Sequence, residues 1–209
     1  MTAGVRRRRA VSAKDKSERR DEIVAAAKEV FARKGFHDAT IADIARQAGL
    51  AYGSVYWYFD SKDELFHALM AVEEAALRAH LTAALAGSEN ELSVLLRSSV
   101  RATLEFFEAD RATVNLLLHD PYALGERFEK RLGGIYERLV DDLETFIVAA
   151  QERGEVVAAP PRMVAYTLAA LVGQLAHRRV STDDDVTTAQ VADFVVALVL
   201  DGLRPRAAG

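Results

Sequence analysis

Apolar residues recur along most of the chain at intervals of three and four positions, which is the period of an α-helix. In the first such segment, Ile23, Ala27, Val30 and Phe31 fall on one face. No segment sustains the apolar–polar alternation of a strand. The pattern predicts an all-α protein of about nine helices, at about residues 17–34, 41–48, 52–59, 61–85, 89–108, 112–119, 121–153, 161–180 and 186–203.

Capping residues and a glycine mark the ends of the helices near the N-terminus. Thr40 and Asp43 resemble a capping box with the shorter acid, and Ser61 with Glu64 has the usual pattern. Gly49 follows the last apolar residue of the second helix, where a left-handed residue commonly ends a helix. The second and third helices are therefore joined by a very short turn.

This turn has the residue spacing of a helix-turn-helix. Ala45, Gly49 and Val55 stand at relative positions 0, 4 and 10. A small residue is needed where two helices cross steeply, glycine permits the tight turn, and valine fills the wedge between the helices. Because alanine and glycine are common, the spacing alone is compatible with either a DNA-binding motif or an ordinary helical corner.

Charge is distributed unevenly along the chain. The net charge is −4, but residues 1–62 hold 13 Lys/Arg and 8 Asp/Glu, whereas residues 63–209 hold 14 and 23. A basic N-terminal part followed by an acidic C-terminal part indicates an anion-binding domain attached to a soluble domain. The run Arg6 to Arg9 accounts for much of the asymmetry, so a disordered basic tail without a partner is the competing interpretation. The tail could also add non-specific attraction to DNA.

Several classes of protein are disfavoured by what the sequence lacks. It has no cysteine, which excludes a disulfide framework and fits a cytoplasmic location. No run of 18 uncharged apolar residues predicts a membrane span, and the charged N-terminus does not resemble a secretory signal. The sequence contains neither a nucleophile elbow, a phosphate loop nor a dinucleotide fingerprint, and its five histidines are not paired as zinc ligands. We expect no catalytic activity, no cofactor and no metal.

One long segment is similar to a known family. The stretch IVAAAKEVFARKGFHDATIADIARQAGLAYGSVYWYFDSKDELF, residues 23–66, resembles the DNA-binding domain of the tetracycline-repressor (TetR) family of transcriptional regulators. The matching pattern comprises an amphipathic helix ending in Gly-Phe, then Thr-x-x-x-Ile-Ala, Gly-Leu, and an aromatic cluster followed by Lys-x-x-Leu. Two positions depart from it, since the family often has Lys, Arg or Gln at Tyr52 and His at Tyr58. Base preferences at these positions therefore cannot be transferred.

The aromatic cluster can be divided between two faces. Steps of 100° per residue place Val55 and Phe59 toward the core and Tyr52 and Tyr56 on another face. Trp57 and Tyr58 lie between these faces. The resemblance implies that Tyr56 contacts the phosphate backbone, and we expect Tyr52 to contact a base. The residues predicted to form the DNA-binding surface are Thr40, Ala51, Tyr52, Gly53, Ser54, Tyr56, Trp57, Tyr58 and Lys62.

Some of these residues have a plain structural alternative. Thr40 caps its helix whether or not DNA is present, and Trp57 could instead pack against the first helix. Lys62 is expected to clamp phosphate near the start of the fourth helix, and a solvated surface charge is the lesser alternative.

The remainder of the chain is predicted to dimerise and to bind a ligand. Apolar seams on the last two helices would pair with a second copy in a four-helix bundle, although they could also be buried within one chain. The predicted interface residues are Val164, Leu168, Leu171, Leu175, Val191, Phe194, Val195 and Leu198. The candidate pocket residues, each of which taken singly fits an ordinary core better, are Phe106, Phe107, His119, Tyr122, Phe128, Tyr136, Phe146 and Tyr166.

Together these features predict three regions: a disordered basic tail (1–16), a helix-turn-helix DNA-binding domain (17–62) and a ligand-binding and dimerisation domain (63–209). The expected protein is a cytoplasmic, homodimeric regulator, a repressor that binds a palindromic operator and is released by a small hydrophobic effector. No membrane partner is expected. The alternative is a helical adaptor that binds protein and has no inducer.

Overall fold

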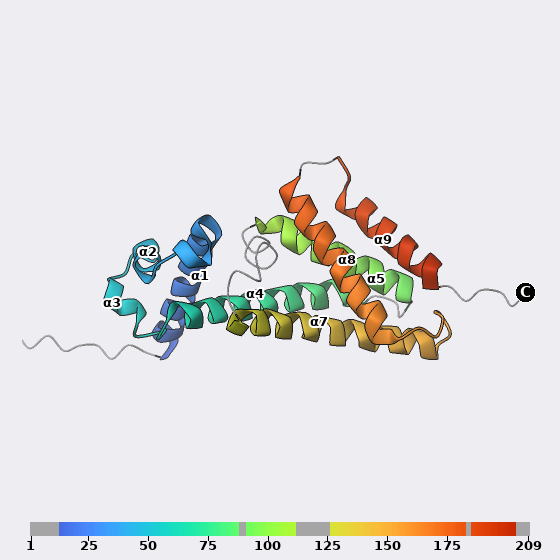
Figure 1. Ribbon diagram of the computed structural model, residues 1–209, viewed down its shortest axis with the longest axis horizontal. Helices are drawn as coiled ribbons and strands as arrows, with labels where there is room; N and C mark the ends of the chain where they lie inside the picture. Colours follow the sequence, from blue (N-terminus) through green and yellow to red (C-terminus); the bar gives the residue numbers. More distant parts are fainter. Residues whose placement is uncertain (1–12, 88–90, 112–125, 183–184, 204–209) are drawn as a thin grey trace, which may run out of the picture. The chain divides into compact units, whose positions relative to one another are not determined.

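The computed structural model describes residues 13–87, 91–111, 126–182 and 185–203, with the side chains of 13, 126–132 and 203 left undescribed. Within these ranges the chain is all-α, as the sequence predicts, and it forms eight helices (Figure 1). The predicted helix at about 112–119 lies outside the described residues. The helices are α1 (Ala13–Asp38), α2 (Ile41–Gln47), α3 (Tyr52–Val55), α4 (Lys62–Leu85), α5 (Leu92–Ala109), α7 (Glu126–Glu152), α8 (Pro161–Ser181) and α9 (Thr188–Leu203).

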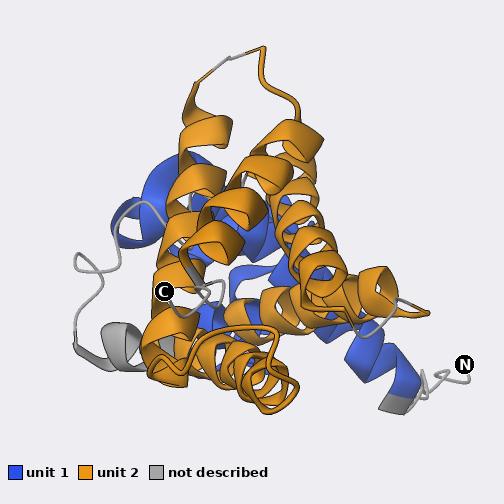
Figure 2. Ribbon diagram, turned by 90° about the vertical axis from the view of Figure 1, so that its right-hand side faces the viewer, with its two compact units in different colours: residues 1–69 blue, residues 70–209 orange. Residues whose placement is uncertain are grey.

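The chain divides into two compact units, residues 1–69 and 70–209, which are coloured separately in Figure 2. Helix α4 contributes its first turns to unit 1 and the rest to unit 2. None of the described helices is both long and apolar enough to cross a bilayer.

Unit 1 is organised around the apolar face of α1. Ile23, Ala27, Val30 and Phe31 are all buried, which confirms the predicted stripe. At the end of this helix Gly35 has φ 76°, so the regular α1 helix stops there, as predicted. The rings of Phe31, Phe36 and Phe66 meet with centroid distances of 5.1–5.6 Å. This aromatic cluster joins the end of α1 to the beginning of α4.

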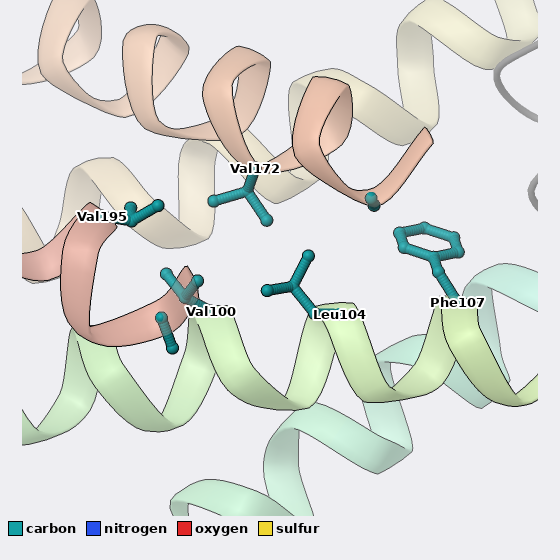
Figure 3. Packing of buried hydrophobic residues seen from close by; sticks show 7 residues of the cluster. Val100, Leu104, Phe107, Val172 and Val195 are labelled. Atoms are coloured by element: carbon teal, nitrogen blue, oxygen red, sulfur yellow. The ribbon is translucent and has the colours of Figure 1, made fainter. Parts of the chain in front are cut away.

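Unit 2 is built on α5, against which both α8 and α9 pack. Val100, Leu104 and Phe107 of α5 meet Val172 of α8 and Val195 of α9 in one buried cluster (Figure 3). A second cluster joins α5 and α9 to α7 and α8 through residues that include Leu96, Ile147 and Leu168. Burying such side chains contributes on the order of 2 kcal/mol each.

Charged contacts reinforce the packing of unit 2. Arg179 of α8 pairs with Glu108 of α5, which also accepts a hydrogen bond of 2.7 Å from Thr188 of α9. The Arg179 side chain is only 13% exposed, so this contact fixes three helices at a shielded point. In unit 2, α5, α7, α8 and α9 therefore form a bundle, and the side of α8 and α9 that faces α5 is buried in its core.

Candidate DNA-binding surface

The turn between α2 and α3 closes with the hydrogen bonds of a Schellman motif. The Leu50 amide donates to the Ala45 carbonyl at 2.8 Å, and the Gly49 amide donates to the Arg46 carbonyl at 3.2 Å. Gly49 has φ 66°, a left-handed backbone conformation that glycine adopts at little cost. The helix-turn-helix predicted from the spacing of Ala45, Gly49 and Val55 is therefore formed.

A complete capping box holds the start of α2. The Thr40 hydroxyl accepts from the Asp43 amide at 3.1 Å, and an Asp43 carboxylate oxygen accepts from the Thr40 amide at 3.2 Å. The Thr40 hydroxyl also donates to this carboxylate at 2.8 Å. The predicted cap is confirmed. However, the amide and the hydroxyl of Thr40 already have partners, so neither is open to a phosphate without rearrangement.

Burial sorts the aromatic cluster as the helical period predicts. Val55 is fully buried and Phe59 is 1% exposed, whereas Tyr52 is 55% and Tyr56 is 42% exposed. Trp57 is 73% exposed, so the alternative in which it packs against α1 is wrong. Of the other predicted surface residues, Ala51 and Gly53 are exposed, and Ser54 and Tyr58 are half-buried. Unit 1 thus presents several aromatic side chains to solvent beside the helix-turn-helix.

The two exposed tyrosines contact each other. Their hydroxyl oxygens lie 3.0 Å apart, and their rings meet edge to face with centroids 5.3 Å apart. The hydrogen bond to Tyr52 and partial desolvation both raise the pKa of Tyr56 above its ordinary value of 10.0. The Tyr56 hydroxyl therefore stays protonated at neutral pH and remains able to donate to an anion.

Lys62 has a different role from the predicted one. Its ammonium donates to the carbonyl oxygens of Phe36, His37 and Ala39 at 2.6, 3.0 and 2.9 Å. It also lies 4.4 Å from the centroid of the Phe36 ring. An ammonium group has three N–H donors, and here all three have partners. The phosphate-clamp role does not fit this geometry. Lys62 instead fastens the end of α1 to the start of α4.

Sequence reasoning missed the charge pattern around Asp43. This carboxylate lies 2.9 Å from the Lys34 ammonium and 3.6 Å from the Arg46 guanidinium. Hydrogen bonds from Lys34 and then Thr40 lower the pKa of Asp43 to about 2. Arg46, whose side chain is 79% exposed, is an additional candidate for phosphate contact. The i, i+3 spacing of Asp43 and Arg46 could have indicated their pairing, but Lys34 comes from another helix.

The structure corrects part of the predicted dimer interface. Leu168 and Val195 are 3% and 0% exposed within the single chain, because both face the α5 side of the bundle. Buried side chains of this kind are not available to a partner, and Val164 likewise packs against the inner cluster that contains Leu168. Phe194 and Leu198 are 63% and 54% exposed. The remaining predicted residues, Leu171, Leu175 and Val191, are half-buried and pack in part against the buried cluster of α5, α8 and α9, so each has only part of its surface open to a partner.

The predicted pocket residues do not form one group. Phe107 is buried in the core of unit 2, with Phe106 packed against it, whereas Phe146 is 37% exposed on the surface. Tyr136 and Tyr166 lie together, with ring centroids 6.0 Å apart. His119, Tyr122 and the side chain of Phe128 lie outside the described residues. The pocket prediction is therefore wrong for two residues, because Phe107 lies in the core and Phe146 lies on the surface.

Comparison with known proteins shows a family similarity over the segment that contains the helix-turn-helix. Residues 23–69 match the family model for bacterial regulatory proteins of the tetR family. This segment of the chain is therefore similar to the DNA-binding part of the TetR family. The match covers α2, α3 and most of α1, and it ends in the first turns of α4.

Relatives extend the similarity in two ways. The transcriptional regulator SrpR of Pseudomonas putida is 41% identical over 71 residues, which are 34% of this chain and 33% of SrpR. The transcriptional activator FasR of Mycolicibacterium smegmatis is 27% identical over 194 residues, covering 90% of this chain and 84% of FasR. The chain thus spans only a third of SrpR but most of FasR.

A solved structure has the same fold across both units. The transcriptional regulator FadR of Bacillus subtilis, crystallised with stearoyl-CoA, superposes with a TM-score of 0.79 at 17% identity. The match covers 88% of this chain and 99% of that one. At this identity the comparison shows a shared fold.

Replacing Lys62 with methionine is expected to destabilise unit 1. Three carbonyl groups lose a charged donor, and the loss is about 2 kcal/mol of unfolding free energy. Lys14→Met is the matched control, because the Lys14 side chain is 83% exposed and forms a surface ion pair with Glu18, one turn further along α1. Thermal unfolding followed by circular dichroism measures both. Equal melting temperatures for the two variants would show that the three carbonyl contacts do not stabilise the protein.

The Asp43 contacts should make stability depend on acid pH. The pKa of this carboxyl is lower in the folded chain, at about 2, than its ordinary value of 3.8. Its contribution is therefore present above pH 3.8 and is lost as the pH falls toward 2. The wild type should melt at a higher temperature than Asp43→Asn near neutral pH, and the gap should close over this window. A gap that stays constant with pH would mean that the ionised carboxylate is not what stabilises the cap.

Proposed function

We propose that the protein is a DNA-binding transcriptional regulator that acts from the cytoplasm as a homodimer on a palindromic operator. The observation that supports this most directly is the exposed aromatic face beside the helix-turn-helix. Tyr52, Tyr56 and Trp57 stay in solvent while Val55 and Phe59 hold the segment against the core. Rigid phenols and an indole beside a helix-turn-helix suit contact with phosphates and base edges in the major groove.

A second copy of the chain is the proposed occupant of the uncovered side of α9. Phe194 and Leu198 are four residues apart, so they share one face, and both are more than half exposed. Leu171 and Leu175 of α8 are four apart in the same way and half-buried. One recognition segment reads few bases, whereas a two-fold dimer reads two half-sites. Pairing of α8 and α9 across a two-fold axis supplies that symmetry and covers these side chains.

An effector with a long apolar part is proposed to control DNA binding. FadR shares the fold of both units and was crystallised with stearoyl-CoA, so an acyl-CoA is the first effector class to test. The aromatic pair Tyr136–Tyr166 and the side chain of Phe106 are the remaining pocket candidates whose surroundings are described. An effector shifts DNA affinity only by binding one conformation of the dimer better than the other.

The direction of regulation has two candidates. We propose repression, in which the dimer occupies a promoter until the effector releases it. Activation is the second candidate, because FasR, which is similar along 90% of this chain, is named an activator. A helical adaptor that binds protein through the same aromatic face is the remaining alternative.

Selection from random DNA tests the proposed regulator. The full-length chain should enrich an inverted repeat whose half-sites are about one helical turn, roughly 34–36 Å, or a multiple of it apart. Binding should weaken linearly in a plot of log affinity against log salt. A pool with no enriched sequence would contradict the regulator and favour the adaptor.

Charge placed on the proposed dimer face should separate the protomers. Phe194→Glu buries a carboxylate at the centre of the interface, so micromolar protein should sediment as a monomer, whereas the wild type is a dimer. Val148→Glu is the matched control, since Val148 is an exposed apolar residue of α7, and this variant should remain dimeric. A monomeric wild type, or a dimeric Phe194→Glu variant, contradicts the assignment of this face.

Stearoyl-CoA should lower the affinity for the selected operator and raise the melting temperature of the chain, because it binds the folded state. Coenzyme A without an acyl chain is the control and should change neither quantity at the same concentration. If both compounds act equally, the apolar chain is not what the protein recognises. If neither acts, stearoyl-CoA is excluded as the effector.

A further inference from the structure

The contact between Tyr52 and Tyr56 limits what these two residues can do at a DNA surface. The two side chains stand four residues apart on the exposed face, and their hydroxyl oxygens lie 3.0 Å apart. Their rings touch edge to face at 5.3 Å, with an interplanar angle of 72°. This arrangement favours stable aromatic packing, so the hydrogen bond is held by ring contact as well as by helix geometry.

The number of O–H protons limits how the two tyrosines can hydrogen-bond to each other and to a phosphate. A phenol has a single O–H donor, and phosphate oxygens accept hydrogen bonds but do not donate them. A tyrosine that contacts phosphate must therefore use its only proton there. If the pair stays intact, the second tyrosine must donate to the first. The two hydroxyls together can then present one donor to the DNA.

We propose that Tyr52 is a positioning residue for Tyr56: it donates its hydroxyl proton to the Tyr56 oxygen while Tyr56 donates to a backbone phosphate. This inference rests on the proposed DNA-binding function and assigns the order within the pair. The hydrogen bond from Tyr52 increases the polarity of the Tyr56 O–H bond, which strengthens its bond to a charged acceptor. The ring contact fixes the direction in which Tyr56 points before DNA arrives, which lowers the entropic cost of binding.

One consequence concerns sequence specificity. In the DNA complex the hydroxyl proton of Tyr52 is committed to Tyr56, so it cannot also donate to a base acceptor in the major groove. The proposal therefore assigns the Tyr52 hydroxyl to the phosphate backbone and not to hydrogen bonding with a base. Phosphate contacts fix orientation without carrying base information, so removing the Tyr52 hydroxyl should weaken binding to all sequences alike.

A double-mutant cycle on the selected operator tests the proposal. Tyr56→Phe should raise Kd about tenfold and Tyr52→Phe about threefold, while the double variant should match Tyr56→Phe at about tenfold. Tyr52→Phe should reduce affinity by the same factor for operators altered at each base pair of the half-site. Independent contacts would instead give about thirtyfold for the double variant, which would overturn the pair. A larger loss from Tyr52→Phe, or a changed base preference in that variant, would overturn the assigned order.

A measurement without DNA separates this proposal from the proposed function. In the free protein the bond between the two hydroxyls raises the pKa of Tyr56, as expected when Tyr56 donates to Tyr52, so Tyr52→Phe should move that pKa down toward 10.0 in a tyrosine-labelled NMR titration. The order within the pair reverses when a phosphate accepts the Tyr56 proton. An unchanged Tyr56 pKa overturns the hydrogen-bonded pair whatever the DNA result. A lowered pKa together with a wild type that binds no operator shows that the pair exists but the regulator assignment fails.

Discussion

The burial of Val55 against the core determines the rest of the candidate site. The left-handed residue Gly49 turns the chain between α2 and α3, and Val55 then has no exposure at all. Once Val55 and Phe59 face inward, the 100° step of the helix forces Tyr52 and Tyr56 outward. The exposed aromatic surface is therefore a geometric result of core packing. Exposing this much apolar surface to water is unfavourable, and an aromatic patch of this kind is typical of a surface that a partner covers.

Contacts outside the turn hold this surface in place. Lys62 joins the start of α4 to the last carbonyls of α1, and Phe36 lies both under its ammonium and within the aromatic cluster. Asp43 joins the start of α2 to Lys34 of α1. These polar contacts connect the helix-turn-helix to the long first helix by side chains that sequence patterns would assign to the surface. Polar ties of this sort specify one relative arrangement of helices, whereas apolar packing tolerates several.

The sequence predicts the parts of the structure that depend on local chemistry. The helical period, the capping box at Thr40 and the stop at Gly35 depend on neighbouring residues, so the all-α fold and the outward tyrosines follow from the sequence alone. Contacts between segments that are distant in the sequence could not be predicted in this way. Lys62 and the carbonyl of Phe36 are 26 positions apart, and no local pattern relates them.

The dimer prediction shows a second limit of periodicity. An apolar stripe indicates that a face is buried but does not say whether the same chain or a partner buries it. Leu168 and Val195 belong to stripes that α5 and its neighbours cover, whereas Phe194 and Leu198 lie on the uncovered side of α9. For the same reason Phe107 could not be recognised as a core residue before its neighbours were known.

If the exposed face of the α2–α3 segment meets DNA, the environment of Trp57 must change when the operator binds. Trp57 is the only tryptophan in the chain, and its side chain is 73% exposed. Acrylamide quenching of its fluorescence can therefore be measured on the unmodified protein with and without the selected operator. The account predicts that operator binding shields Trp57 and reduces quenching. An operator complex in which Trp57 is quenched as strongly as in the free protein would contradict it.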